Sequence, residues 1–539
     1  MKKPKRQLNK HQKQTFIQGT LILVAAGIIN RILGFIPRIM LPRIIGAEGV
    51  GIYQLGYPFF IVLMTIITGG IPLAVSKIVS EAEAANNPKA SQTVLRISLA
   101  LTLTLGIIFM LLSILFAPWI TQTILTDPRV YHTFVSMSPM LVIVAVSSVY
   151  RGYFQGKQNM IPSALSSIVE TLARIVCVLW FSFLLLPKGI EFGAAGAMLG
   201  VMAGEFIGFL ILLWQYHAEN RKGDDPETND TLEAEAPILP PKRVLRRLLK
   251  ITIPVTAGKL VGSFSYLFES IITAQSLALA GFATSVVTAQ YGALQGMIIP
   301  LLLLPGALTA ALSVSLVPSL SEAATRNDMV TIHKRLNQTL RLALVTGAPF
   351  SVLMFVLAAP LCLLLYNDHN ISGMLQLMAP FALFIYVQSP LMVALQALDH
   401  PGKALRNTLI GSAIKLFLIW YLASQPQYGI LGAVIAIIAN SIIVTLLHGF
   451  SVAKMLSFKY KVFDFVKMGV SMIVMAGGTQ FAYNHLPFHQ LAWLQFIAAS
   501  MVGMIIYFII IFSIKLVSFR DLDKIPMIGN WFRSKQKFT

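Results

Sequence analysis

The chain has 539 residues, of which 56% are hydrophobic and 12% are charged, and it has a net charge of +20. Soluble domains are roughly 45–50% apolar and about 25% charged, so these values exclude an ordinary soluble enzyme and an intrinsically disordered chain. They predict an all-α protein that crosses a membrane many times. In such a protein, an excess of Lys and Arg indicates cytoplasmic loops and gives no reason to expect a nucleic-acid partner.

The sequence has no pattern typical of a metal site or a catalytic site. Its two cysteines, Cys177 and Cys362, both lie in apolar runs, which does not favour a disulfide framework. His485 and His489 are separated by Pro487 and have no further ligand nearby, so they predict a polar loop and not a metal pair. No nucleotide-binding Gly-x-x-x-x-Gly-Lys-[Ser/Thr] motif, Ser/His/Asp set or carboxylate dyad is present. We therefore expect no enzyme activity, metal or cofactor.

Fourteen segments reach the length of about 20 mainly apolar residues that a membrane-spanning helix requires. The predicted spans are 16–41, 52–76, 94–117, 131–154, 161–186, 192–216, 251–280, 286–317, 340–366, 373–398, 405–424, 429–452, 464–484 and 490–517. The first apolar run is too long for a signal peptide and has no Ala-x-Ala cleavage site, so it is predicted to be a span. An even number of spans places both termini on one side of the membrane.

The basic residues indicate which side that is. At or beyond the ends of the spans, only Arg38, Arg43, Arg129 and Lys188 fall on the side opposite the termini. Because cytoplasmic loops carry the excess of Lys and Arg, both termini are predicted to be cytoplasmic.

The longest polar segment runs from Ala218 to Pro241 and is rich in Asp and Glu, which is typical of a solvated linker. The stretch from Lys242 to Lys250 that follows has basic residues interleaved with apolar ones at helical spacing. This pattern predicts a helix lying on the anionic inner leaflet of the membrane. A site for a protein partner is the alternative.

The two halves of the chain contain a repeat at a nearly constant offset. Pro58 matches Pro300, Ser80-Glu81-Ala82 matches Ser321-Glu322-Ala323, and Arg174 matches Lys415. Six spans in each copy predict two parallel lobes related by an axis along the membrane normal. The predicted organisation is an N-terminal lobe (1–217), a cytoplasmic linker with an interfacial helix (218–250), a C-terminal lobe (251–453), a terminal helix pair (454–517) and a cytoplasmic tail (518–539).

Ionisable residues inside the spans are the candidate functional residues, because each costs roughly 2.5–3.5 kcal/mol on insertion and by default marks a water-filled pathway. Arg31 and Arg38 lie two turns apart on one helical face. Arg43 follows and is expected to extend to the outer surface. Lys259 and Glu269 share one predicted span, but about 15 Å separates them along it, too far for a local pair.

Two further groups of charges lie inside the spans. Glu170 and Arg174 have i,i+4 spacing, which predicts an ion pair and, as the alternative, part of a substrate site. The repeat counterpart of Arg174 is Lys415, which has a glycine where the acid would be. Glu205 lies in Gly200-x-x-x-Gly204-x-x-x-Gly208, a spacing that is typical of a helix-packing face.

Arg31, Arg38 and Lys259 belong to the first predicted helices of the two lobes, so they are expected to meet across one central cavity. A cationic cavity in a membrane suits an anionic substrate, and arginine matches phosphate oxygens in a bidentate manner. The alternative is that these residues only tie helices to carbonyls and acids.

Several motifs resemble those of the multidrug/oligosaccharidyl-lipid/polysaccharide exporter superfamily, and within it the stage V sporulation protein B group of bacterial polysaccharide transporters, relatives of the lipid II flippase. They are Gly19-Thr20-Leu21, Arg31-Ile32-Leu33-Gly34-Phe35, Arg43-Ile44-Ile45-Gly46-Ala47-Glu48-Gly49-Val50-Gly51, Ala74-Val75-Ser76-Lys77, and the run from Lys259 to Glu269. The resemblance covers essentially the whole chain. It implies a flippase of the bacterial cytoplasmic membrane that works by alternating access between two lobes.

The leading hypothesis is thus a flippase for an undecaprenyl-pyrophosphate-linked cell-wall precursor, with lipid II as the first candidate. The alternatives are an exporter of another lipid-linked glycan, a cation-coupled drug exporter, and a membrane scaffold that recruits wall enzymes. The expected partners are an anionic polyprenyl-linked glycolipid and inner-leaflet lipids, with cell-wall synthesis enzymes as candidates. The absence of an ATP motif predicts coupling to an ion gradient or to the membrane potential, with Glu205, Glu170 and Glu269 as the acids that could exchange a cation or proton.

Overall fold

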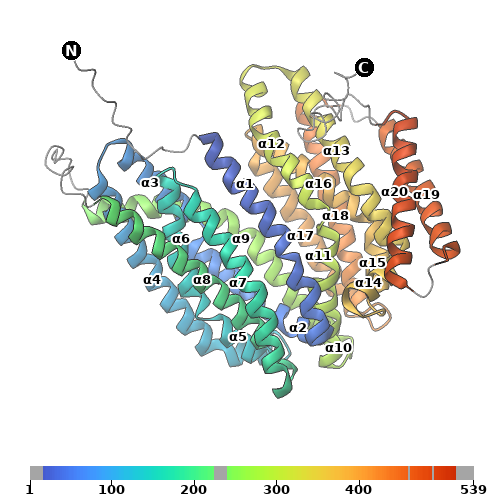
Figure 1. The fold of residues 1–539 in the computed structure, drawn as a ribbon, viewed down its shortest axis with the longest axis horizontal. Helices are drawn as coiled ribbons and strands as arrows, with labels where there is room; N and C mark the ends of the chain where they lie inside the picture. Colours follow the sequence, from blue (N-terminus) through green and yellow to red (C-terminus); the bar gives the residue numbers. More distant parts are fainter. Residues whose placement is uncertain (1–15, 224–239, 459–461, 488–490, 517–539) are drawn as a thin grey trace, which may run out of the picture. The chain divides into compact units, whose positions relative to one another are not determined.

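A computed structural model describes residues 16–223, 240–458, 462–487 and 491–516, and every regular element in these ranges is a helix. This confirms the all-α prediction. The helices that begin before residue 297 are α1 (Phe16–Leu33), α2 (Phe35–Thr68), α3 (Ile71–Ala84), α4 (Pro88–Trp119), η1 (Ile120–Ile124), α5 (Val130–Met137), α6 (Met140–Gly156), α7 (Ile161–Leu185), η2 (Leu186–Lys188), α8 (Ile190–Gly223), α9 (Pro241–Leu279), α10 (Thr284–Gly292) and η4 (Ala293–Ile298) (Figure 1).

The later helices complete the described structure. They are α11 (Ile299–Leu303), α12 (Gly306–Thr325), α13 (Met329–Val356), α14 (Ala358–Tyr366), α15 (Ser372–Met378), η5 (Ala379–Phe381), α16 (Ala382–Ala397), α17 (Pro401–Ala423), α18 (Ile430–Leu456), α19 (Val462–His485) and α20 (Ala492–Ser513). The acidic part of the predicted linker, His489 and the predicted cytoplasmic tail (518–539) lie outside the described residues.

Twelve segments of the described residues form helices long and apolar enough to cross a membrane. The first two predicted spans both overlap one of them, Ile22–Ala84. The predicted span 405–424 overlaps α17, which is not among the twelve and carries Lys403, Arg406 and Lys415. Each of the other predicted spans overlaps one of the remaining segments. The chain is therefore a multi-pass membrane protein, while the count of fourteen spans stays a prediction.

The chain divides into two compact units, unit 1 up to Gly296 and unit 2 from Met297. Unit 1 includes α9 and α10, both of which pack against α2. This boundary differs from the lobe boundary predicted from the repeat. The units are defined by contacts between helices, whereas the lobes were predicted from repeated sequence. The two six-helix lobes stay a prediction.

The helices at the start of unit 1 are interrupted at glycines. Gly34 separates α1 from α2, and Gly69 and Gly70 separate α2 from α3. The predicted loop 42–51 contains a sharper break at Gly46, where φ is 66° and ψ is 178° and the two helical stretches of α2 meet. A residue with a side chain is strained at this φ, so glycine permits the kink.

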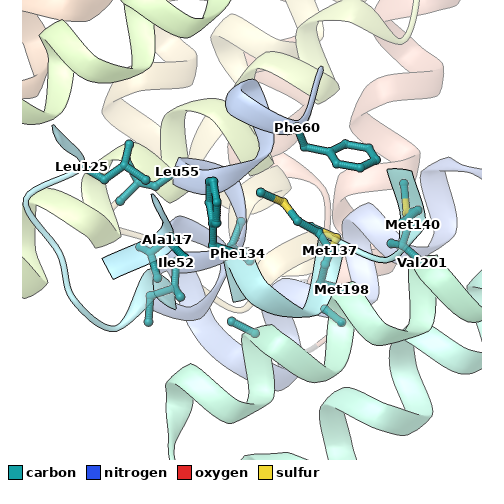
Figure 2. Close-up of a cluster of buried hydrophobic side chains, with 14 of the residues drawn as sticks. Ile52, Leu55, Phe60, Ala117, Leu125, Phe134, Met137, Met140, Met198 and Val201 are labelled. Carbon is teal, nitrogen blue, oxygen red and sulfur yellow. The ribbon is translucent and has the colours of Figure 1, made fainter. Parts of the chain in front are cut away.

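A cluster of buried apolar side chains holds α2 against α5, α6 and α8 within unit 1 (Figure 2). Ile52, Leu55 and Phe60 of α2 meet Phe134 of α5 and Met198 of α8 in this cluster. In a bilayer, helices associate through close packing, because lipid tails are as apolar as the side chains themselves. The shape of this cluster, and not the exclusion of water, therefore positions α2.

Unit 2 contains the last helices of the chain. The Tyr386 hydroxyl donates to the Leu302 carbonyl at 2.8 Å, and the Tyr507 hydroxyl donates to the Val345 carbonyl at 2.8 Å. Each buried hydroxyl thus ties two helices together where no water competes. The helices α19 and α20 lie side by side (Figure 1), and α13 contacts both of them.

Candidate functional site

The packing of α7 against α8 positions the buried charges of unit 1. A Cβ atom at Gly204 would lie 2.7 Å from Arg174 Cβ, and one at Gly208 would lie 2.8 Å from Glu170 Cβ. Gly200 faces Val178 one turn further along. The three glycines therefore form the predicted packing face, and their small size brings Glu205 beside the Glu170 and Arg174 turn.

Four charged side chains form one network at this contact. Arg174 donates to Glu170 Oε1, as the i,i+4 spacing predicts, and lies 3.3 Å from Glu205 Oε1. Arg151 of α6 donates to Glu170 Oε2 at 2.5 Å and lies 3.8 Å from Glu205 Oε2. We call Arg151, Glu170, Arg174 and Glu205 the charge network. It contains two cations and two anions, so its formal charge is zero.

The charge network is largely buried. The side chains of Glu170 and Glu205 are 7% and 11% exposed, and those of Arg151 and Arg174 are 28% and 31% exposed. Within the described residues, Arg151 Nε and Arg174 Nε donate no hydrogen bond. The two arginines therefore balance the acids without using all of their donors, and they keep donors for a further anion.

Arg151 was not among the predicted site residues, because its place near the end of a predicted span suggested a cytoplasmic loop. No local spacing in the sequence pairs it with Glu170. Both α6 and α7 pack against α8, and this shared packing brings Arg151 to Glu170.

Three tyrosines of unit 1 lie near one another, and two of them are close to the charge network. The rings of Tyr53 and Tyr57 on α2 are stacked, with centroids 6.2 Å apart and an interplanar angle of 15°. Both tyrosines lie within electrostatic range of Arg174 and Arg38. Tyr266 of α9 lies within range of Tyr53, Tyr57, Arg38 and Glu269. We call Tyr53, Tyr57 and Tyr266 the tyrosine cluster, and it brings Arg38, Arg174 and Glu269 into one neighbourhood.

Lys259 of α9 ties two helices together at the break between α2 and α3. Its Nζ donates to the Gly69 carbonyl at 2.6 Å. One turn further along, the hydroxyls of Thr65 and Ser263 share a 2.8 Å hydrogen bond. This contact is of the kind expected if Lys259 only ties helices to carbonyl groups, which is the alternative to a role in substrate binding.

The remaining predicted site residues have different surroundings. Arg31 and Arg38 are exposed, and neither makes a hydrogen bond or an ion pair with another described residue. Glu269 is buried and accepts a 2.7 Å hydrogen bond from Gln295. Lys415 belongs to unit 2, where it is 8% exposed. The role of each residue in transport stays a prediction.

A second group of charges surrounds the loop before α5. Asp127 is 1% exposed and accepts hydrogen bonds from Arg129 Nε at 3.0 Å and from Thr288 Oγ1 at 2.7 Å. Arg129 also donates to Glu48 at 2.6 Å. The hydrogen bond that Arg129 donates to Asp127 raises the pKa of Arg129 most, burial opposes it, and the hydrogen bond donated to Glu48 raises the pKa further. This group is structural, since its polar atoms are satisfied by one another and connect α2, α5 and α10.

No group of three or more His, Cys, Asp or Glu side chains is placed to hold a metal ion within the part of the chain that the structure describes. The candidate site of unit 1 therefore consists of the cations Arg38, Arg174 and Lys259, the tyrosine cluster, and the buried acids Glu170, Glu205 and Glu269. Guanidinium and phenol groups together suit a ligand that has anionic oxygens and sugar hydroxyls.

The comparisons with known proteins cover almost the whole chain. It is 38% identical over 522 residues to stage V sporulation protein B of Bacillus subtilis (strain 168), and the alignment covers 96% of this chain and 99% of that protein. It is 26% identical over 489 residues to the lipid II flippase MurJ of the same organism, over 85% of this chain and 86% of that one.

The fold is similar to those of solved transporters. A structure described as lipid II flippase MurJ, inward closed conformation, has a TM-score of 0.68 at 16% identity and covers 93% of this chain and 100% of its own. An inward-facing multidrug resistance MATE family transporter of the MOP superfamily has a TM-score of 0.62 at 15% identity and covers 81% and 98%. At such identities the similarity concerns the fold. The profile of a family described as polysaccharide biosynthesis protein matches residues 16–324, and this chain belongs to that family.

Proposed function

We propose that this protein is a flippase that moves an undecaprenyl-pyrophosphate-linked cell-wall precursor, with lipid II as the first candidate, across the bacterial cytoplasmic membrane by alternating access. The observation that carries the proposal is a group of cations beside the tyrosine cluster, inside the membrane-spanning unit of a polysaccharide biosynthesis family member. The similarity to stage V sporulation protein B and to the lipid II flippase supports the same substrate class.

In this proposal, the arginines bind the pyrophosphate. Arg31 and Arg38 are exposed and have no carboxylate to displace, so they make the first contacts. Arg174 is held by Glu170 and Glu205 and becomes available when the substrate anion competes with them. Lys259 and Glu269 complete the site on α9, and Lys415 is the corresponding candidate in unit 2.

The acids of the charge network provide coupling. If Glu205 binds a proton or a cation, Arg174 loses one of its two counterions, and the network acquires a net positive charge that favours the substrate anion. Release of that proton or cation returns Arg174 to Glu205 and expels the substrate. The membrane potential is worth about 2.3 kcal/mol per unit charge per 100 mV, enough to bias such a cycle without ATP.

The proposed topology has both termini in the cytoplasm. The proposed partners are the lipid-linked glycan, inner-leaflet lipids and cell-wall synthesis enzymes. Fusing a reporter that is active only outside the cytoplasm to each predicted loop tests this topology. Reporter activity in fusions to loops that are predicted to lie on the same side as the termini would contradict it.

The deciding experiment is a translocation assay in proteoliposomes that contain the purified chain and a fluorescent lipid II. A membrane-impermeant quencher reports the fraction of label in the outer leaflet. We expect transport of lipid II well above that of protein-free vesicles, and loss of transport in Arg174→Gln. If the chain transports other polyprenyl-linked glycans but not lipid II, the proposed substrate is wrong and one of those glycans takes its place. Export of an organic cation instead would favour a drug exporter.

A scaffold gives a different result in this assay. No lipid-linked glycan would then be transported, although a chain with Arg38→Gln or Arg174→Gln would still restore wall synthesis in cells. Transport and complementation therefore have to fail together in these variants if the proposed function is correct.

A further inference from the structure

The first turns of α9 present a basic surface whose orientation is determined by packing. Val244 and Leu248 are 2% and 0% exposed and lie in one apolar cluster with side chains of α3, α4, α6 and α8. The prediction of a helix lying on lipid was therefore incomplete, because these two apolar residues face protein. The five basic residues of the same turns are exposed: Lys242, Arg243, Arg246, Arg247 and Lys250.

A cavity of about 160 Å³ lies between this basic surface and α3. Four residues line it, namely Ile78, Arg243, Val244 and Arg247. Two guanidinium groups thus border an apolar wall formed by Ile78 and Val244. We call this the α3–α9 cavity.

The positive charge of the α3–α9 cavity is partly neutralised by Glu81. Arg247 donates to Glu81 of α3, and both side chains are more than two-fifths exposed, at 44% and 43%. An ion pair this exposed is worth about 0–1 kcal/mol, so a stronger anion can displace the carboxylate. Arg243 forms no ion pair with another described residue.

The position of the cavity along α9 points to a lipid. The basic turns directly precede the apolar part of α9, which belongs to the candidate membrane-spanning segment Pro241–Leu279. A lipid headgroup at the end of this span would have its phosphate within reach of the arginines. Clusters of Lys and Arg at the end of a spanning helix attract anionic lipids.

We propose that the α3–α9 cavity binds the phosphate of an anionic phospholipid such as phosphatidylglycerol, between Arg243 and Arg247. Two guanidinium groups match the phosphate oxygens in a bidentate manner. Glu81 competes with the lipid for Arg247. The proposal does not depend on the transport function, because it concerns binding at the start of α9 and not the candidate site.

Binding is measured on the full-length purified protein in detergent, by titration with short-chain phosphatidylglycerol. Parallel titrations use short-chain phosphatidylcholine and inorganic phosphate. The double variant Arg243→Gln/Arg247→Gln removes both cavity cations. Its matched control, Lys242→Gln/Arg246→Gln, removes the same charge from exposed positions that do not line the cavity.

We expect the cavity variant to lower the affinity for phosphatidylglycerol by about tenfold or more, and the control by less than about threefold. Glu81→Gln should raise the affinity, because it releases Arg247. Phosphatidylcholine and inorganic phosphate should bind at least about tenfold more weakly than phosphatidylglycerol.

Three results would overturn the proposal. Equal losses in the cavity variant and its control would show that the whole basic surface acts as a diffuse field. If phosphatidylcholine binds as tightly as phosphatidylglycerol, the cavity does not distinguish an anionic headgroup from a zwitterionic one. Inorganic phosphate binding as tightly as the lipid would show a site for free anions. Glu81→Gln keeps the test decisive if the double variant does not fold, because an unchanged affinity there contradicts a role for Arg247.

Discussion

The Lys259 ammonium donates a 2.6 Å hydrogen bond to the carbonyl of Gly69, where α2 ends and the chain turns into α3. At the same break, a Cβ at Gly70 would lie 2.7 Å from Thr252 Cα, so α9 approaches the turn as closely as glycine permits. A cation predicted to bind substrate therefore already has a structural partner. The two roles can be separated by experiment.

Replacement of Lys259 by Met keeps the aliphatic stem and removes the charge. If the contact with Gly69 is the main role, the free energy of unfolding should fall by about 1.5–3 kcal/mol, the value of a hydrogen bond to a charged group. If Lys259 also binds substrate, transport should fall in Lys259→Met but recover in Lys259→Arg. Thermal unfolding and the translocation assay measure the two effects. The control is Lys334→Met at an exposed position of unit 2.

Arg31 and Arg38 should be required for transport and dispensable for folding. Both are exposed and make no hydrogen bond or ion pair with any other described residue, so Arg31→Gln and Arg38→Gln should change the free energy of unfolding by no more than about 0.5 kcal/mol, as ordinary surface changes do. Transport of lipid II should be abolished. Arg335→Gln, at an exposed position of α13 in unit 2, is the matched control. Normal transport in Arg31→Gln would contradict a substrate-binding role for that residue.

Glu170 should matter more for stability than Glu205. Glu170 contacts Arg151 at 2.5 Å and also Arg174, whereas the contacts of Glu205 are 3.3 Å and 3.8 Å long. Removing one partner of a buried pair costs about 3–5 kcal/mol, so Glu170→Gln should be strongly destabilising and Glu205→Gln distinctly less so. The Glu170→Gln/Arg174→Gln double variant should recover part of the loss, as measured by a double-mutant cycle. Equal effects of the two single variants would contradict this order.

The approach of α7 to α8 should tolerate no added methyl group. Gly204→Ala places a Cβ 2.7 Å from Arg174 Cβ, and overpacking of this kind costs about 1–3 kcal/mol. The same substitution at Gly262 of α9, where nothing lies within 4 Å, should be neutral or stabilising. Thermal unfolding of the two variants provides the comparison. If both behave alike, α7 and α8 are not held together by this glycine face.

The membrane potential should drive transport. Moving unit charge through the full potential is worth about 2.3 kcal/mol per 100 mV. Collapse of the potential at constant ATP should therefore stop flipping of lipid II in wild-type vesicles. Glu205→Gln should reduce the dependence on an imposed proton gradient, because the exchangeable acid is lost. Undiminished flipping in fully depolarised vesicles without any ion gradient would show that the chain is a passive scramblase.

Local sequence patterns were sufficient to predict the helices and the contacts within a single helix. They also predicted a contact between two helices where a glycine repeat marks the packing face. The pairing of Glu170 with Arg174 follows from i,i+4 spacing, and the α7–α8 contact follows from Gly200, Gly204 and Gly208. Apolar length predicted nearly all of the membrane-spanning segments, because the bilayer imposes the same length on each of them. The family resemblance followed from the motifs between Gly19 and Glu269.

Only the tertiary structure decided which distant residues meet. Arg151 joins Glu170 because α6 and α7 both pack against α8, and Lys259 reaches Gly69 because α9 crosses the break after α2. The breaks at Gly34 and Gly69 lie inside predicted spans, where hydropathy carries no boundary, whereas the kink at Gly46 falls in the predicted loop 42–51. Val244 and Leu248 face protein for the same reason, since protein and lipid interiors select the same apolar side chains and only packing distinguishes them.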